Sequence, residues 1–418
     1  MLAVLHERTR VGRLGAAGRE LEFAYDAKWR ARTGAFALSP RLPLREQPWH
    51  GEEVLFFFAN LLPEGNLLDT LCKLRRLPRG NVLRLLEAFG RECAGAFEIV
   101  PEDEQGARAP KPDYAAYSNA ALRKDLANLR ANIPLLQAHG ALRLSLAGAQ
   151  NKIPVRYDGR KLWLPQHGAP STHILKPALQ PEAEYPDAVR NEAFCMRLAG
   201  ALGMNVPATT VLTDPEPMLL IARYDRVVDG EKIRRLHQLD LCQLTGTLPD
   251  QKYESDGGPG FADLFAQVDA HSAAPALDRL ALVDWLLCNF LIGNVDAHAK
   301  NVAMLYTNAG RLRLAPAYDL LALGHWSRLS TDMAMAIGGE RRPEWVQARH
   351  WQRLCEAVGL NAAQLRRRAL RLAATAESAH KELARDLELP QKLRRSIGAT
   401  LRQRGDWIER RLAVQETP

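Results

Sequence analysis

The stretch from Leu280 to Asp319 constrains the possible fold of this chain more than any other part of the sequence. Its first third, Leu280 to Ile292, is apolar on almost every side of a helix, which predicts a buried helix. Gly293 follows, and glycine commonly ends helices because it adopts left-handed backbone angles at little cost. The sequence then predicts an apolar strand at Val302 to Tyr306, a turn, and a return to Asp319. We therefore expect a hairpin anchored on a core helix.

Polar side chains at the two ends of this hairpin suggest phosphoryl transfer. A protein kinase uses one carboxylate to accept the proton of the attacking hydroxyl, an asparagine five residues later to hold a metal ion, and a second aspartate for Mg²⁺. Asp296, Asn301 and Asp319 follow that order and spacing. The spacing predicts a catalytic base at Asp296 and metal ligands at Asn301 and Asp319.

The same residues also suit two other interpretations. Asp296 and Asn301 are residue types that cap loops, and Asp319 could be the N-cap of a following helix. A metal hydrolase could use Asp296, His298 and Asp319 as ligands. However, no second histidine nearby has zinc-like spacing, and asparagine is a poor ligand for zinc. Oxygen ligands instead favour Mg²⁺ that is shared with substrate phosphates.

The composition is that of a globular protein. With 418 residues, 47% of them hydrophobic and 25% charged, the chain is long enough for two or three domains with real cores. The net charge of +8 suits an anionic partner such as a nucleotide or nucleic acid, although a solvated surface would also account for it.

The cysteines and the apolar runs indicate the compartment. The six cysteines contain no C-x-x-C pair, and several lie in apolar helical contexts, so they predict buried thiols in a reducing compartment. No apolar run reaches the roughly 18 residues that span a bilayer, and charged residues soon follow the apolar start at Met1. We therefore expect a cytoplasmic protein with neither a signal peptide nor a membrane segment.

Residues 1 to 100 form a first unit in this interpretation. Strands are predicted at Met1 to Glu7 and Leu21 to Tyr25, with a glycine-rich turn at Gly12 to Gly18 between them. A helix that contains Phe56 to Leu62 is expected to stop at Pro63-Glu64-Gly65, before a further helix. Val82 to Phe89 is also predicted to be helical, and the acidic, proline-rich piece 101–112 has little to bury and marks a boundary.

The middle of the chain alternates in the period of two that is typical of strands. Leu142, Leu144 and Leu146 begin this pattern, and Asp158-Gly159 is predicted to be a two-residue hairpin turn. Strands are predicted at Ile153 to Tyr157, Lys161 to Leu164, Thr172 to Leu175, Thr209 to Leu212 and Met218 to Tyr224, and a helix at Arg190 to Leu202.

The rest of the chain is almost wholly helical in prediction. Helices are expected at Phe261 to Val268, Leu277 to Ile292, Glu344 to Val358, Ala362 to His380 and Arg394 to Leu412. Strands followed by helices predict an α+β, two-lobed, protein-kinase-like fold. The domains would be an N-terminal domain (1–105), a linker with a helix (106–140), a nucleotide-binding lobe (141–240) and a helical lobe with the catalytic loop (241–418).

Three features of the middle region suit nucleotide binding. The small residues of the loop Ser145 to Lys152 would let backbone N–H groups approach a polyphosphate, although a tight hairpin with Gly148 explains them equally. Lys176 ends an apolar strand, where a kinase lysine contacts the α- and β-phosphates. Glu192 on the next helix could pair with Lys176, unless Lys176 is an ordinary strand-end lysine and Glu192 a solvated helix residue.

Arginines are concentrated near the C-terminal end. They are Arg366, Arg367, Arg368, Arg371, Arg394, Arg395, Arg410 and Arg411. On helices such clusters usually form solvated faces, and the functional alternative is contact with DNA phosphates in a complex.

Several motifs in a fixed order resemble the HipA family of bacterial serine/threonine kinases, the toxins of HipBA toxin–antitoxin systems. The N-terminal part is similar through FFFANLLPEGN and AFGRECAGAFEIVP, and the middle through SLAGAQNK, STHILKP, NEAFCMRLA, RYDR and HQLDLCQ. The end is similar through FLIGNVDAHAKN and LAPAYDLL. The resemblance covers nearly the whole chain.

This resemblance implies ATP and Mg²⁺ as cofactors and assigns further residues to the site. Ser145 matches the family's serine of inhibitory autophosphorylation, and the adenine would contact backbone atoms near Ala222, where the family more often has glutamate. Tyr318-Asp319-Leu320 stands where other kinases have Asp-Phe-Gly. The residues implied at the nucleotide are Ala147, Gly148, Ala149, Gln150, Asn151, Lys152, Lys176, Ala222, Arg223, Tyr224, Gln238, His298, Lys300 and Tyr318.

The resemblance also implies a function and partners. The expected activity is phosphorylation of a cellular protein, with aminoacyl-tRNA synthetases as the family's known substrates, and growth arrest as the consequence. The expected partner is a HipB-like helix-turn-helix antitoxin, and DNA is reached only through that complex. Two alternatives stay open: a catalytically silent corepressor with the kinase fold, and a small-molecule kinase of aminoglycoside-phosphotransferase type.

Overall fold

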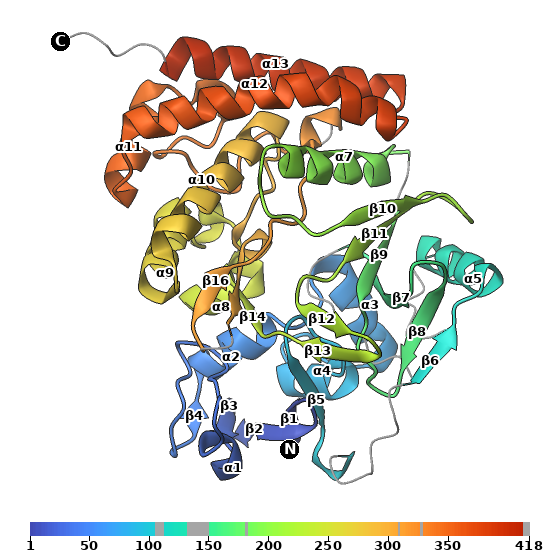
Figure 1. The fold of residues 1–418 in the computed structure, drawn as a ribbon. Coiled ribbons are helices and arrows are strands. Elements are labelled where there is room, and N and C mark those ends of the chain that lie inside the picture. The colour runs from blue at the N-terminus through green and yellow to red at the C-terminus, as the bar shows by residue number, and fades with distance from the viewer. Residues whose placement is uncertain (105–112, 132–149, 180–182, 308–309, 327–328, 413–418) are drawn as a thin grey trace. The chain divides into compact units, whose positions relative to one another are not determined.

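The structure is a computed structural model that describes residues 1–104, 113–131, 150–179, 183–307, 310–326 and 329–412. It has the predicted α+β composition, with strands and helices in two compact units (Figure 1). The first unit contains Met1–Pro177, Leu212–Asp250 and Met304–Leu312. The second contains Ala178–Val211, Gln251–Ala303 and Arg313–Pro418. The chain thus enters each unit more than once, unlike the consecutive domains that we expected.

A five-stranded antiparallel sheet begins the first unit. Its order is β4 (Trp49–His50), β3 (Glu20–Tyr25), β2 (Thr9–Ala17), β1 (Leu2–His6) and β5 (Phe97–Pro101). The turn predicted at Gly12 to Gly18 is wrong for residues 12–17, which belong to β2, and only Gly18 lies in the turn that leads to β3. Gly12 is required by close packing rather than by a turn, since a Cβ there would lie 2.4 Å from the Ala24 carbonyl oxygen.

Four helices follow in the N-terminal segment. They are α1 (Ala27–Arg30), α2 (Glu52–Ala59), α3 (Gly65–Arg75) and α4 (Val82–Phe89). The predicted break at Pro63-Glu64-Gly65 is confirmed, because α2 ends before it and α3 begins at Gly65. The bounds predicted for α4 are also confirmed. Its N-cap is Asn81, whose side chain accepts a hydrogen bond from the Arg84 amide.

A second sheet forms the other core of the first unit. Its order is β10 (Thr209–Leu212), β11 (Met218–Ala222), β9 (His173–Pro177), β7 (Ile153–Tyr157), β8 (Leu162–Gln166) and β6 (Asp113–Ala116). Helix α5 (Asn119–Arg130) buries Leu122, Leu126 and Leu129 against it. This apolar contact holds the strands that carry the expected nucleotide residues.

The predicted two-residue turn at Asp158-Gly159 is wrong. Tyr157 pairs with Leu162, so four residues, 158–161, connect β7 to β8. The Asp158 carboxylate accepts hydrogen bonds from the backbone N–H groups of Arg160 and Lys161, at 2.9 and 2.8 Å. These bonds form an Asx turn, which makes the connection longer than two residues.

Shorter elements complete the first unit. β12 (Arg226–Asp229) pairs with β13 (Lys232–Arg235), and β14 (Gln238–Asp240) leads into α8 (Leu241–Thr245). β15 (Ala303–Tyr306) lies between β14 and β16 (Leu312–Leu314). The strand predicted after Asn301 is therefore confirmed.

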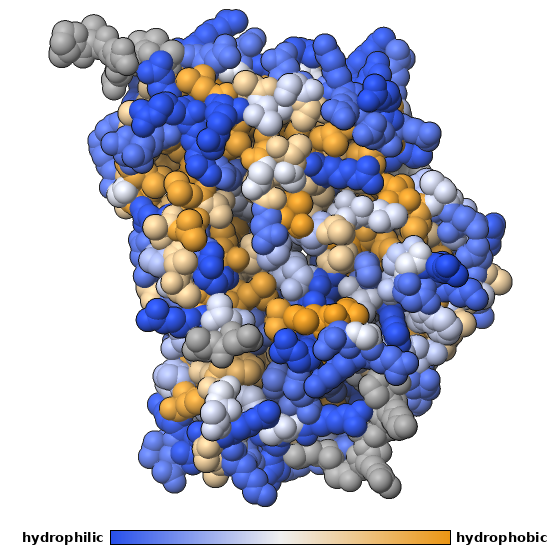
Figure 2. Space-filling model, in the orientation of Figure 1, coloured by the Kyte–Doolittle hydropathy of each residue, from blue (hydrophilic) through white to orange (hydrophobic). Residues whose placement is uncertain are grey.

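The second unit is mainly helical. Its helices are α7 (Ala188–Ala201), α9 (Phe261–His271), α10 (Pro275–Ile292), α11 (Ala348–Val358), α12 (Ala362–Asp386) and α13 (Gln391–Leu412). The long helix α12 packs against α13 and α7, and α10 packs against α9 and α13. Figure 2 shows mainly hydrophilic residues over α12 and α13, as expected for helices with one solvated face.

Helix α10 bears out the central expectation from the sequence. Its residues from Leu282 to Ile292 are buried on all sides, and Gly293 ends it with φ of +71°. All six cysteines are buried and unbridged. Within the described ranges, no helix combines the length and apolar character that crossing a bilayer requires.

Candidate active site

The loop that follows α10 is closed on itself by three hydrogen bonds. The His298 amide donates to the Asp296 carbonyl (2.8 Å), and the Asn301 amide donates to the His298 carbonyl (2.9 Å). The side-chain Nδ2 of Asn301 also donates to the Asp296 carbonyl, at 3.1 Å. A short 3₁₀ turn, Ala299–Asn301, results. The D-x-x-x-x-N spacing therefore brings the two predicted residues together in one folded loop.

The carboxylate of Asp296 is held by a tyrosine from another segment. Tyr253 donates its hydroxyl to Oδ1 of Asp296 at 3.0 Å. The Tyr253 ring also contacts the His298 ring edge-on, with centroids 5.3 Å apart. Sequence analysis missed Tyr253 because it lies 43 residues before Asp296, and no local pattern marks it.

Asp319 lies in a strained backbone conformation rather than at a helix N-cap. Its φ is +60°, which is uncommon for residues other than glycine and often found at functional sites. Nδ2 of Asn294 donates to the Asp319 carbonyl at 3.3 Å and to Oδ1 of Asn289 at 2.7 Å. The capping alternative for Asp319 is wrong, since no helix begins in the described residues directly after it. Asn294 is a second residue that sequence analysis missed.

The neighbouring Tyr318 belongs to the same loop structure. Its hydroxyl donates to the Lys300 carbonyl at 2.7 Å. This bond ties the segment that carries Asp319 to the turn that carries His298, Lys300 and Asn301. The six predicted site residues of the second unit are thus connected in one loop structure. They are Asp296, His298, Lys300, Asn301, Tyr318 and Asp319.

The ligand types in this group fit magnesium better than zinc. Because Nδ2 of Asn301 is used by the Asp296 carbonyl, its Oδ1 is the atom of that amide suited to a cation. In the part of the chain that the structure describes, no three His, Cys, Asp or Glu residues are grouped to hold a metal. Asp296, His298 and Asp319 therefore do not form the hydrolase site considered above. Amide and carboxylate oxygens, completed by phosphate, are typical of Mg²⁺.

Two lysines of the first unit lie at one end of a strand pair. Ile153 of β7 pairs with Leu175 of β9 in antiparallel register. Lys152 and Lys176 are the next residues outward on the two strands, so they flank the same end and share one face of the sheet. Lys176 is buried at the end of β9. Two lysines at the same end of a strand pair suit a polyphosphate.

The segment expected to contact adenine begins on β11, the antiparallel neighbour of β9, at the end of this strand pair that is opposite to Lys176. Ala222 pairs with His173, whereas Leu219 pairs with Lys176. At about 3.4 Å per residue, Ala222 and Lys176 are therefore separated by roughly 10 Å along the sheet. A base at one end and phosphates at the other would contact the same pair of strands.

Backbone and side-chain contacts distinguish the residues of this segment. The Arg223 amide donates to the Thr172 carbonyl at 2.9 Å, and the Arg223 carbonyl accepts from the Arg226 amide at 3.3 Å. Base contacts are therefore expected from Ala222 and Tyr224 rather than from Arg223. Oε1 of Gln238, which follows β13, is buried and has no hydrogen-bond partner among the described residues. An acceptor of this kind suits an exocyclic amino group.

The remaining predicted residues have simpler outcomes. Glu192 is buried in α7, so the solvated alternative is wrong for it. Gln150 and Asn151 are partly buried directly before β7. Ser145, Ala147, Gly148 and Ala149 lie outside the described residues, as does the strand pattern at Leu142, Leu144 and Leu146.

Some of the late arginines have structural partners. Arg368 forms a two-pronged ion pair with Asp284 of α10. Arg411 donates to the backbone carbonyls of Glu344 and Val346, at 3.1 and 3.3 Å. These two side chains are therefore used in packing the helices of the second unit.

Comparisons with known proteins agree with this arrangement. Residues 2–100 match the family HipA N-terminal domain, and residues 144–380 match the family HipA-like C-terminal domain. Protein Y4mE of Sinorhizobium fredii is 38% identical over 374 residues, which cover 88% of this chain and 87% of that protein. The serine/threonine-protein kinase toxin HipA of Shewanella oneidensis is 30% identical over 350 residues, covering 80% and 78%.

A solved structure shows the same fold. In the Shewanella oneidensis complex of HipA, HipB and operator DNA, one chain is similar to this protein with a TM-score of 0.84 and 27% identity. The similarity covers 99% of this chain and 98% of that chain. With both domain families matched in order and the fold shared over its whole length, this chain belongs to the HipA family.

Proposed function

We propose that this protein is an ATP- and Mg²⁺-dependent serine/threonine protein kinase that acts as a HipA-like toxin. The observation that supports this most strongly is the closed loop in which Asn301 donates to the Asp296 carbonyl while Tyr253 holds the Asp296 carboxylate. A loop-capping role alone does not require a tyrosine on the carboxylate. The loop leaves a carboxylate and an amide oxygen for chemistry, as phosphoryl transfer needs.

Asp296 is the general base in this proposal. Its carboxylate accepts the proton of a serine or threonine hydroxyl while the hydroxyl oxygen bonds to the γ-phosphorus. The bond from the γ-phosphorus to the β,γ-bridging oxygen breaks, and ADP leaves. Tyr253 orients the carboxylate by its hydrogen bond, so that the basic oxygen has a fixed position.

Asn301 and Asp319 are the proposed ligands of Mg²⁺, which when bound neutralises charge on the phosphates. Lys152 and Lys176 bind the phosphates, and Ala222, Tyr224 and Gln238 bind the base. His298 and Lys300 complete the nucleotide contacts. Asn294 supports the strained backbone at Asp319 and so fixes the direction of its carboxylate.

Ser145 is the proposed site of inhibitory autophosphorylation. A phosphate carries about two negative charges near neutral pH, and would repel the loop from a site that binds a polyanion. The Ser145→Ala variant is expected to lose self-labelling and to keep labelling a protein substrate. Loss of both activities, as expected of Asp296→Asn, would contradict a regulatory role for Ser145.

The proposed partner is a HipB-like helix-turn-helix antitoxin, and the proposed substrate is a cellular protein such as an aminoacyl-tRNA synthetase. The similarity to HipA in a complex with HipB and operator DNA supports the first part. Copurification with a small helix-turn-helix protein encoded beside this chain would test it. Comparison of phosphopeptides after expression of wild type and Asp296→Asn would identify the substrate.

The activity itself is tested with radiolabelled ATP and Mg²⁺ on the full-length protein. Wild type is expected to incorporate label into itself or an added protein, and Asp296→Asn at least about a hundredfold less. Asp406→Asn is the matched control, because this exposed residue of α13 undergoes the same chemical change. Equal labelling of all three proteins, or none in any, would overturn the proposal. Label found only on a metabolite would favour a small-molecule kinase.

A further inference from the structure

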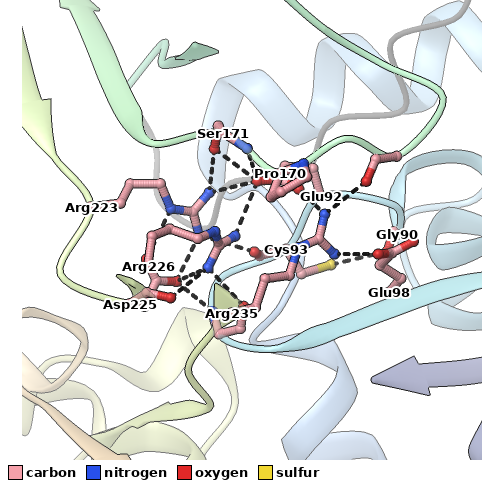
Figure 3. Close-up of polar contacts among 12 residues, drawn as sticks. Gly90, Glu92, Cys93, Glu98, Pro170, Ser171, Arg223, Asp225, Arg226 and Arg235 are labelled. Carbon is pink, nitrogen blue, oxygen red and sulfur yellow. Dashed lines mark hydrogen bonds and ion pairs between the residues drawn. The ribbon is translucent and has the colours of Figure 1, made fainter. Parts of the chain in front are cut away.

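Five buried charged side chains and the partly exposed Glu98 lie together in the first unit, away from the proposed phosphate contacts. Three carboxylates (Glu92, Glu98, Asp225) face three guanidinium groups (Arg223, Arg226, Arg235). Figure 3 shows Arg223 and Arg226 directed toward Glu92 and Asp225, and Arg235 directed toward Glu92 and Glu98. The formal charges balance. Such a network is expensive to bury and is retained where it fixes a conformation.

Glu92 is the member with the most partners. Its Oε1 accepts from Nη1 of Arg223 (2.9 Å), Nη2 of Arg226 (3.1 Å) and the hydroxyl of Ser171 (2.8 Å). Its Oε2 accepts from Nη2 of Arg235 at 2.5 Å. The side chain is 3% exposed, and although burial opposes its charge, the three arginines lower the pKa of Glu92 to about 2. Glu92 is therefore an anion throughout the physiological range.

Asp225 is the second carboxylate that binds Arg223. Its carboxylate accepts from Nε and Nη2 of Arg223, at 2.9 and 2.7 Å, and from the backbone amide of Gly95 at 2.9 Å. Nη2 of Arg223 also donates to the Cys93 carbonyl at 3.2 Å. Every guanidinium nitrogen of Arg223 is thus bonded, and two of its acceptors come from the segment that carries Glu92.

Arg223 connects this network of charges to the expected base contacts. Arg223 lies between Ala222 and Tyr224, the two residues from which base contacts are expected. Its amide is bonded to Thr172 and its side chain to Glu92, so both the backbone and the side chain of this residue are fixed. Glu92 is separated from Arg223 by 131 positions and precedes the whole middle region.

We infer that Glu92 is a positioning residue for the nucleobase, acting through Arg223 on the backbone of Ala222 and Tyr224. The inference rests on the proposed function. It makes the N-terminal segment a component of the nucleotide site rather than a separate module. The close approach of Gly95 to Gln238, another base-contact candidate, supports this inference. A Cβ added at Gly95 would lie 3.1 Å from the backbone nitrogen of Gln238, so the N-terminal segment packs closely against that residue.

The test compares Glu92→Gln with Glu98→Gln in the full-length protein. Both changes remove one buried or half-buried carboxylate from Arg235, but only Glu92 contacts Arg223 and Arg226. The measurements are the KM for ATP, kcat, and the binding of two probes, adenosine and inorganic tripolyphosphate. A melting curve of each variant reports whether it is folded.

A folded Glu92→Gln protein is expected to bind adenosine and ATP about tenfold more weakly, a change of about 1.4 kcal/mol. Its binding of tripolyphosphate is expected to change less than about twofold, since Lys152 and Lys176 are untouched. Glu98→Gln is expected to match wild type in both. Equal weakening of both probes in a folded Glu92→Gln protein, or no weakening of either, would overturn the inference.

Ser171→Ala decides the question if Glu92→Gln does not fold. It removes one neutral hydroxyl that contacts Glu92 and Arg223, and is expected to weaken adenosine binding about threefold without affecting tripolyphosphate. Unchanged adenosine binding would overturn the inference while leaving the kinase proposal in place. A wild-type protein that binds neither adenosine nor ATP would instead overturn the proposed function, and the inference with it.

Discussion

The side-chain amide of Asn301 donates a hydrogen bond to the backbone carbonyl of Asp296, with a nitrogen–oxygen distance of 3.1 Å. The proposed metal ligand therefore also closes the loop of the proposed base. Loop closure uses Nδ2 of this amide, and the proposed metal binding would use Oδ1, so the two roles that the sequence offered as alternatives are compatible.

Two substitutions separate these roles. Asn301→Ala removes both the donor and the metal oxygen, and is expected to lower kcat at least about a hundredfold. Asn301→Asp keeps oxygen ligands but places a carboxylate against the Asp296 carbonyl, where the donor is lost. It is expected to retain Mg²⁺-dependent ATP binding and to lose most of kcat. If Asn301→Asp has wild-type kcat, the hydrogen bond to Asp296 has no catalytic importance.

The bond from Tyr253 to Asp296 predicts a smaller effect. Tyr253→Phe removes only the hydroxyl that donates to Oδ1 of Asp296, and keeps the ring that contacts His298. One lost hydrogen bond, worth about 1 kcal/mol, is expected to lower kcat about fivefold with little change in the KM for ATP. Tyr157→Phe is the control, because among the described residues its hydroxyl donates only to the Gly159 carbonyl, at 2.9 Å. If Tyr253→Phe loses free energy of unfolding but keeps the wild-type kcat, the role of this hydroxyl is purely structural.

The atoms packed around Gly95 predict how strongly an alanine at this position destabilises the protein. Its φ is +81°, and an added Cβ would lie 3.1 Å from both Nδ1 of His237 and the Gln238 nitrogen. Gly159 has a φ of +94° with nothing within 4 Å of such a Cβ. Gly159→Ala is expected to cost about 1 kcal/mol of unfolding free energy, from backbone strain alone. Gly95→Ala is expected to cost about 2–3 kcal/mol. Urea unfolding of both variants measures the difference, and equal losses would show that the packing around Gly95 can relax.

His237 predicts a pH dependence of stability. It is fully buried and donates from Nε2 to the Leu38 carbonyl at 2.7 Å. Burial lowers the pKa of His237 from 6.5 to about 3. Between these values the unfolded chain binds one proton more than the folded chain, so the free energy of unfolding decreases as pH falls below about 6.5. The decrease from pH 7.5 to pH 5.5 is expected to be about 1 kcal/mol for this residue.

The measurement is urea unfolding of wild type and His237→Gln at both pH values. The glutamine variant is expected to lose about 1 kcal/mol less than wild type over this interval, whatever its own stability. An identical pH response of wild type and His237→Gln would contradict the role of burial at His237.

The outcomes for particular elements show what local pattern can and cannot predict. Helix α4 and the stop of α10 at Gly293 were predictable, because apolar periodicity and a left-handed glycine are local signals. The turn predicted at Gly12 to Gly18 was wrong up to residue 17, because a glycine required by close packing in a strand, such as Gly12, looks the same in sequence as a glycine required by a turn, such as Gly18. The hairpin at Asp158 failed because the Asp158 carboxylate extends the connection through its own hydrogen bonds.

The sequence by itself determined the order of the motifs, the helix that ends at Gly293, and the residue types Asp296, Asn301 and Asp319 at the spacing of a catalytic loop. Only the tertiary structure decided that Tyr253 holds Asp296, that Asn294 supports Asp319, and that Glu92 reaches Arg223. The physical reason is the separation along the chain between the residues that interact. Helix propensity, glycine angles and loop spacing act between near neighbours in the chain. A buried carboxylate, by contrast, takes its partners from whichever distant segments the folded core brings within hydrogen-bonding distance.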